Sequence, residues 1–190
     1  ASELYPFYYF PGYYQCEIDE DCKYEKILVG EHEEFFPFAV PSCPDGDIVS
    51  GGEGGKIYRW KPKDDGTYDQ EFVGQHGSKV GPIQGLPNKD ILSGGIDDNK
   101  IYRWKSKGDG TYDQEFVGEH EDAVFVVQGH PNGDVLSAGA DGQIYIWELK
   151  DDRTYERRFV GEHENWVLTA QRLPNRNVIS GGYDNKIYLW

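Results

Sequence analysis

The fold is decided by a segment that occurs twice in the chain. Residues 57–76 read Ile-Tyr-Arg-Trp-Lys-Pro-Lys-Asp-Asp-Gly-Thr-Tyr-Asp-Gln-Glu-Phe-Val-Gly-Gln-His, and residues 101–120 read Ile-Tyr-Arg-Trp-Lys-Ser-Lys-Gly-Asp-Gly-Thr-Tyr-Asp-Gln-Glu-Phe-Val-Gly-Glu-His. Two segments of this length do not match by chance, so the chain contains an internal repeat.

The repeat extends to four copies. Its tryptophans, Trp60, Trp104, Trp147 and Trp190, are spaced 44, 43 and 43 residues apart. Each copy contains Gly-x-His, an apolar stretch, a turn, a Ser-Gly-Gly or Ser-Ala-Gly segment and finally Ile-Tyr-x-Trp. We place the four copies at about residues 24–60, 68–104, 112–147 and 155–190.

Each copy is predicted to contain four short strands. In the third copy these are Val124–Val127, Asp134–Ser137, Gln143–Trp147 and Thr154–Val160, separated by Gly- and Asp-containing turns. Four antiparallel strands in roughly 43 residues are typical of one propeller blade. The 24 Gly and 10 Pro residues interrupt every candidate helix, so we expect an all-β propeller rather than a helical solenoid.

The order Gly-x-His, Ser-Gly-Gly and Asp-(Gly/Asn)-(Gln/Lys)-Ile-x-x-Trp resembles the WD-repeat β-propellers over residues 24–190. In that family a His, a Ser, an Asp and a Trp form a hydrogen-bonded tetrad within each blade. By position, the resemblance implies three complete sets and one incomplete set: His76, Ser93, Asp98 and Trp104; His120, Ser137, Asp141 and Trp147; His163, Ser180, Asp184 and Trp190; and His32, Ser50 and Trp60.

The sequence departs from the family pattern in three ways. The usual Gly-His is Gly-x-His, and the usual Trp-Asp is Trp-Lys or Trp-Glu. In the first copy Gly54 stands where the tetrad Asp is expected, so we expect that blade to be the loosest. The dipeptide Gly129-His130 precedes a Pro-Asn-Gly turn and is not expected to join a tetrad.

Neither catalysis nor metal binding is expected. Ser, His and Asp recur at a structural period, whereas a nucleophilic triad needs one activated Ser in one pocket, and no Gly-x-Ser-x-Gly elbow is present. Acidic segments such as Asp45-Gly46-Asp47 are interpreted as hairpin turns rather than Ca²⁺ loops. We therefore assign no catalytic residue, no metal ligand and no cofactor.

Charge limits the kinds of partner. Lys and Arg number 19 against 34 Asp and Glu, giving a formal net charge of −15. Such a surface repels nucleic-acid phosphates and anionic lipids. With a mean hydropathy of −0.72, the chain also has no apolar run long enough to span a membrane. We expect protein partners, including other copies of the chain, with no nucleic acid and no membrane insertion.

The loops after the repeat histidines differ between copies and are candidate binding sites. The resemblance places these loops on the top face of the ring, where partners commonly dock. Phe35, Lys79 and Trp166 are the partner-binding candidates, and packing under neighbouring loops is the alternative for the two aromatic side chains.

The N-terminal segment, residues 1–23, is rich in aromatic and acidic residues. Its prolines disfavour a helix, and its aromatic side chains must be covered, either by the propeller of the same chain or by a neighbouring subunit. The arm residues that we consider partner-binding candidates are Tyr5, Phe7, Tyr8, Tyr9 and Phe10.

The cysteines and the start of the chain bear on its compartment. Cys16 and Cys22 are predicted to close a small disulfide loop, with free thiols as the alternative. The chain begins at Ala1 and contains no Met, as expected for a processed or trimmed product. These features favour an extracellular protein, and a cytoplasmic one is the alternative.

The sequence is compatible with three ways of completing the propeller. The first copy begins with a predicted outer strand, Tyr24–Val29, and the last copy ends at Trp190 after its third strand. That first strand can close a four-bladed ring, help two chains form an eight-bladed ring, or complete a blade of a neighbour and propagate a filament.

These observations predict a non-catalytic β-propeller scaffold for protein–protein interaction that self-associates through its arm and edge strands. A structural subunit of an extracellular filament or oligomer is one alternative. A carbohydrate-binding, lectin-like propeller is the other, because it would use the repeated tyrosines of Ile-Tyr-x-Trp.

Overall fold

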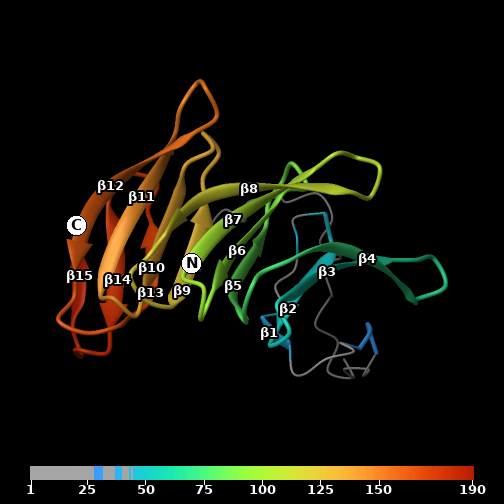
Figure 1. Ribbon diagram of the computed structural model, residues 1–190, viewed down its shortest axis with the longest axis horizontal. Coiled ribbons are helices and arrows are strands. Elements are labelled where there is room, and N and C mark those ends of the chain that lie inside the picture. The colour runs from blue at the N-terminus through green and yellow to red at the C-terminus, as the bar shows by residue number, and fades with distance from the viewer. Residues whose placement is uncertain (1–27, 32–36, 40–42, 44) are drawn as a thin grey trace, which may run out of the picture.

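The computed structural model describes residues 28–31, 37–39, 43 and 45–190, and these contain strands but no helix (Figure 1). The strands form four antiparallel sheets, which we number as blades 1 to 4 in chain order. Blade 1 contains β1 (Pro37–Ala39), β2 (Ile48–Gly52), β3 (Lys56–Pro62) and β4 (Tyr68–Gln75). Blade 2 contains β5 (Val80–Gly85), β6 (Ile91–Gly95), β7 (Lys100–Ser106) and β8 (Tyr112–Glu119).

Blades 3 and 4 differ in their number of described strands, four in blade 3 and three in blade 4. Blade 3 contains β9 (Val124–Gly129), β10 (Val135–Gly139), β11 (Gln143–Leu149) and β12 (Tyr155–Glu162). Blade 4 contains β13 (Val167–Arg172), β14 (Val178–Gly182) and β15 (Ile187–Leu189). Within every blade the strands pair in chain order, as expected for successive hairpins. The all-β propeller architecture predicted from the repeat is therefore confirmed.

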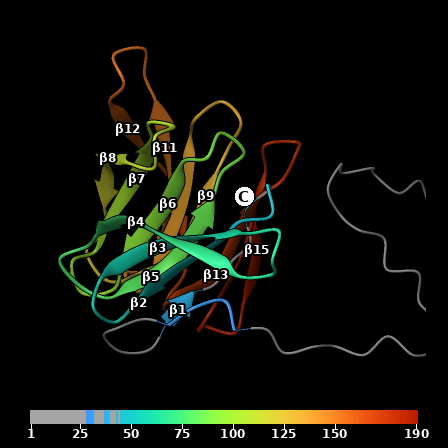
Figure 2. The ribbon, with the colours of Figure 1, turned by 90° about the vertical axis from the view of Figure 1, so that its right-hand side faces the viewer.

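The four blades lie side by side in a row, with blade 1 at one end and blade 4 at the other (Figure 1). Figure 2 looks along this row from the blade 1 end. The first strands of successive blades contact one another, β1 to β5, β5 to β9 and β9 to β13. Each blade therefore packs face to face on the next, and the hydrophobic cores lie between blades.

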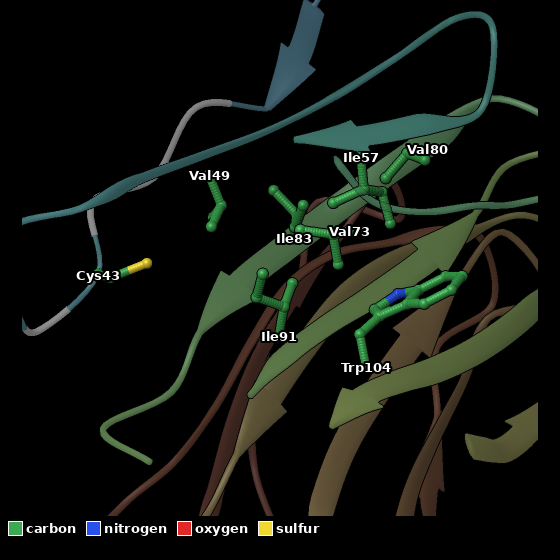
Figure 3. Close-up of a cluster of buried hydrophobic side chains, with 8 residues drawn as sticks. All are labelled: Cys43, Val49, Ile57, Val73, Val80, Ile83, Ile91 and Trp104. Atoms are coloured by element: carbon green, nitrogen blue, oxygen red, sulfur yellow. The ribbon is translucent and has the colours of Figure 1, made fainter. Parts of the chain in front are cut away.

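Each junction is filled by side chains from two neighbouring blades. Figure 3 shows the first junction, where Val49 and Ile57 of blade 1 meet Val80, Ile91 and Trp104 of blade 2. Leu92 and Ile101 play the same part between blades 2 and 3, and Leu136 and Ile144 do so between blades 3 and 4. The middle strands of a blade therefore pack on both faces: in blade 2, Ile91 belongs to the junction with blade 1 and Leu92 to the junction with blade 3, because successive side chains point to opposite faces of a sheet.

A β-bulge recurs at the same place in the first three blades. In blade 2, Ile101 pairs with Gly118 while Tyr102 pairs with Phe116, so Val117 is the extra residue. Blades 1 and 3 show the same shift of register, with Val73 and Val160 as the extra residues. The bulge turns Val117 into the core while leaving Phe116 exposed.

The glycine of each Gly-x-His lies under the tryptophan of the following blade. A Cβ atom added to Gly74 or Gly118 would overlap the ring of Trp104 or Trp147, respectively. Any side chain there would separate the two blades, which explains why the repeat carries glycine at this position.

Candidate interaction site

The tetrad implied by the family resemblance is assembled in blade 3. Trp147 donates its indole N–H to Ser137 Oγ at 2.7 Å, and Ser137 Oγ lies 2.7 Å from His120 Nε2. On the other side of the imidazole ring, His120 Nδ1 lies 2.8 Å from Asp141 Oδ2. The serine hydroxyl thus accepts from the indole and is within hydrogen-bond distance of the imidazole, whose second nitrogen faces the carboxylate.

Blades 2 and 4 bring together the same four residue types. His76 Nδ1 lies 3.2 Å from Asp98 and its Nε2 lies 2.7 Å from Ser93, which also accepts from Trp104. In blade 4 the set is His163, Asp184, Ser180 and Trp190.

Blade 1 has only part of a tetrad in the described residues, and the dipeptide Gly129-His130 takes no part in one. Trp60 donates to Ser50 at 2.7 Å, whereas His32 lies outside the described residues. His130 lies in the turn before β10, where its carbonyl accepts from Gly133, and it joins no tetrad.

Burial prevents the tetrads from acting as nucleophilic triads. Ser93 and Ser137 are completely buried, so no substrate carbon can reach their hydroxyl oxygens. Burial also lowers the pKa of His76, although the neighbouring Asp98 opposes this shift. The lowered pKa favours the neutral imidazole at this position.

The exposed acidic turns are closed by their own hydrogen bonds. The Asp65 carboxylate accepts from both the backbone N–H and the hydroxyl of Thr67, at 2.9 and 2.6 Å. Asp109 with Thr111 and Asp152 with Thr154 form the same turn. Within the part of the chain that the structure describes, no group of acidic, His or Cys side chains is arranged to hold a metal ion.

The turn Asp45-Gly46-Asp47 has a different role, because its two carboxylates bind a buried arginine. Arg59 donates Nη2 to Asp45 at 2.5 Å and Nε to Asp47 at 2.6 Å. Its Nη1 reaches the carbonyl oxygen of Lys89 in blade 2, at 3.0 Å. Although burial opposes the charged form, the hydrogen bond to Asp47 keeps the pKa of Arg59 above its ordinary value.

Arg103 repeats this arrangement at the next junction. Its Nε donates to Asp90 at 2.9 Å, and its Nη1 reaches Tyr155 of blade 3 at 3.2 Å. The repeat pattern did not predict a role for either arginine. The available signal was their place two residues after Ile57 and Ile101, on the inward face of an alternating strand. These arginines join neighbouring blades.

The predicted loop residues lie in different environments. Lys79 forms an ion pair with Glu53 of blade 1 at 3.3 Å, across a blade junction. Trp166 is 46% exposed, and its ring contacts those of Phe125 and Tyr183, with centroids 5.7 and 5.8 Å apart. Phe35 lies outside the described residues.

The arm residues Tyr5, Phe7, Tyr8, Tyr9 and Phe10 and the proposed Cys16–Cys22 pair also lie outside the described residues. Cys43 is a free, buried thiol at the junction of blades 1 and 2. Burial raises the pKa of this thiol to about 11, so it is protonated and unreactive at neutral pH.

The outer face of blade 4 exposes side chains that other blades bury. Ile187 is 77% exposed, whereas its counterparts Ile57, Ile101 and Ile144 are completely buried. On the same blade Ile179 is 38%, Leu168 51% and Leu189 64% exposed. We call Leu168, Ile179, Ile187 and Leu189 the terminal face.

The predicted outer strand Tyr24–Val29 is described only in part. Residues 24–27 lie outside the described residues, and Leu28 and Val29 belong to no strand. An outer strand pairs with the free edge of the third strand of a blade. Among the described third strands, only β15, at the far end of the row, has no outer neighbour.

Four-stranded blades, inter-blade cores and repeated tetrads define the chain as a β-propeller. Residues 112–148 and 155–190 match the family model described as WD domain, G-beta repeat. These two matches support a WD-repeat family for the repeats, and members of that family generally serve as scaffolds for protein–protein interaction. A search of curated proteins finds no matching relative. The described residues include no helix long and apolar enough to cross a membrane.

Proposed function

We propose that the chain is a non-catalytic propeller scaffold that binds proteins, and that one of its partners is a second copy of itself. The observation that supports this proposal is the terminal face. Two of its residues, Ile179 and Ile187, occupy positions that a following blade covers at each of the three earlier junctions. A contiguous apolar surface of this kind is typical of a protein–protein contact.

The favoured occupant is another blade of the same type. At each internal junction the covering surface is a first-strand valine, a second-strand Ile or Val and a tryptophan, as in Val80, Ile91 and Trp104. Full burial of one Ile or Leu side chain contributes about 1.5–3 kcal/mol, so covering the terminal face contributes several kcal/mol. Part of this free energy offsets the lost freedom of the two molecules.

Trp166 and Tyr183 extend the apolar surface at one end of blade 4. Both are exposed and contact each other, and Trp166 follows the histidine loop where the family presents partner-binding residues. Aromatic side chains of this kind are frequent anchors of protein contacts. The carbohydrate alternative, in contrast, required exposed tyrosines in every blade, and Tyr58 and Tyr145 are buried.

The test is the mass of the purified chain in solution, measured by light scattering over a hundredfold dilution. We expect an oligomer that dissociates on dilution, and Ile187→Asp should shift it to monomer. Phe116→Asp is the matched control, because Phe116 is equally apolar and 52% exposed but lies outside the terminal face. A monomer at every concentration would refute self-association. Growth without limit would support the filament form of the same contact.

A further inference from the structure

We infer that a basic cavity at the junction of blades 3 and 4 binds a short acidic segment of a partner protein, through carboxylate or phosphate oxygens of that segment. This inference rests on the proposed scaffold function and names the chemistry of one partner. The cavity is a separate surface, because none of the described residues that line it belongs to the terminal face.

The cavity has a volume of about 470 Å³ and is lined mainly by charged side chains. Its walls come from the turn between β9 and β10, the end of β11 with the residue after it, β12, and β13 with the turn that follows it. Among the described lining residues, the basic ones are Lys150, Arg158, Arg172 and Arg176, and the acidic ones are Asp134 and Glu148. The lining therefore has an excess of two positive charges in a chain whose net charge is −15.

Two of the arginines are specific to this junction. Arg158 stands where blades 1 and 2 carry Glu71 and Glu115, so the sign of the charge is reversed. Arg172 pairs with the first residue of β14, and the residue in that position in blade 3 is Gly129. Since the other blades fold with Glu and Gly at these positions, the requirements of the blade do not explain the arginines.

Arg172 provides a buried positive charge with unused hydrogen-bond donors. Its side chain is 11% exposed, whereas those of Lys150 and Arg158 are 40% and 54% exposed. Arg172 Nη1 lies 3.3 Å from Asp134 Oδ2. Its Nε and Nη2 make no hydrogen bond to any described residue, so both can donate to an oxyanion in the cavity.

Arg176 adds a second guanidinium group that is not held by an ion pair. Lys150 and Arg158 both contact Glu148, at 3.3 and 2.9 Å. Arg176, in contrast, is exposed and has no ion pair within the part of the chain that the structure describes. An oxyanion can therefore bind Arg172 and Arg176 without breaking an ion pair, and the planar guanidinium group matches carboxylate and phosphate geometry.

The charge on the rest of the surface restricts the ligand to a short segment. At an ionic strength of about 0.15 M, charges more than about 8 Å away are largely screened, so the lining dominates for a ligand that stays in the cavity. A nucleic acid extends over the surrounding acidic surface and is repelled. A peptide that places one or two oxyanions in the cavity gains the attraction without that repulsion.

Fluorescence anisotropy with labelled hexapeptides tests this inference on the full chain, at about 150 mM NaCl. The probes are hexaglutamate, hexaglutamine, and a serine-rich peptide with and without one phosphoserine. We expect hexaglutamate or the phosphoserine peptide to bind and the two uncharged peptides not to bind. The tighter of the two acidic peptides identifies carboxylate or phosphate as the preferred oxyanion.

Arg176→Gly is the variant that tests the cavity itself. It removes a guanidinium group that has no ion pair in the described chain, and Gly133 occupies the same position of the turn in blade 3. The φ of Arg176 is 71°, which glycine adopts readily, so the variant should fold. Loss of one charge-assisted contact should weaken binding of the acidic peptide about tenfold.

Lys89→Gly is the matched control. Lys89 is exposed at the equivalent position of the blade 2 turn, with a φ of 70°, and it does not line the cavity. The control thus removes the same charge from the same kind of turn, and peptide binding should change less than twofold, a loss well below the roughly tenfold effect of one charged contact. Thermal unfolding checks that both variants are folded.

Three outcomes would overturn the inference. Unchanged binding by folded Arg176→Gly, or equal losses in the two variants, would show that the peptides bind elsewhere or through net charge alone. Absence of peptide binding while light scattering shows an oligomer would refute the inference and leave the proposed self-association intact. Absence of peptide binding together with a monomer at every concentration would count against the proposed function as well.

Discussion

At the scale of single residues, the stability of each complete blade depends on one serine oxygen that serves two neighbours. Ser137 Oγ accepts from Trp147 and lies 2.7 Å from His120 Nε2, so one hydroxyl group holds both rings. Asp141 Oδ2 lies 2.8 Å from the other ring nitrogen; although burial opposes the charged form, hydrogen bonds from His120 and Gln143 lower the pKa of this carboxyl group.

We expect stability to fall as the pH is lowered through about 6.5, the ordinary pKa of histidine. Burial lowers the pKa of His76 in the folded chain, so below that pH the unfolded chain binds more protons and folding becomes less favourable. Urea unfolding between pH 7.5 and 5 measures this change, above the range where aspartates titrate. His76→Gln should be less stable at pH 7.5 but show a shallower dependence. Equal slopes would contradict this assignment.

The glycines under the tryptophans give a second prediction. Gly118→Ala places a methyl group in steric overlap with the ring of Trp147, so blades 2 and 3 must move apart. We expect this to lower the free energy of unfolding by about 1–3 kcal/mol. Gly77→Ala is the control, because the nearest atom to its Cβ would be Asp98 Oδ2 at 3.7 Å. Thermal and urea unfolding of both variants are the measurements. Equal stability of the two variants would show that the glycine is not required by packing.

At the scale of strands and blades, the repeat predicted most of the architecture. The expected strands of the third copy overlap β9, β10, β11 and β12, because alternating apolar residues and Asp-Gly turns encode a hairpin locally. The sequence did not reveal the Val117 bulge, which depends on how the two strands fit together. It also did not reveal Arg59 and Arg103 as links between blades, because their partners lie in distant turns and in the next blade.

Arg103 offers a test of these links. Blade 3 has Ile146 at the equivalent position, so isoleucine is compatible with the strand. Arg103→Ile nevertheless leaves Asp90 buried without its charged partner, and we expect a loss of about 3–5 kcal/mol in unfolding free energy.

Adding Asp90→Asn removes the uncompensated charge and should restore a large part of that loss. The two single variants and the double variant together form a double-mutant cycle, measured by urea unfolding. A cost below about 1 kcal/mol for Arg103→Ile alone would mean that the link does not contribute to stability.

At the scale of the whole molecule, strong negative charge opposes an apolar contact. Two copies with a net charge of −15 each repel one another, and salt screens this repulsion. We therefore expect the dissociation constant of self-association to fall as NaCl is raised from about 20 to 200 mM. Analytical ultracentrifugation at several salt concentrations measures it. Weaker association at higher salt would instead point to an interface held by ion pairs.

The sameness of the three junctions also bears on how such a protein changes over generations. Every junction uses the same pattern of a glycine beneath a tryptophan and an Ile against a Val, although blade 3 has Ile146 where blades 1 and 2 have the linking arginines. A gene duplication that inserted one more copy of about 43 residues would produce a blade whose two faces already fit its neighbours. Blade number is then free to vary by unequal recombination, while the two ends of the row stay unchanged.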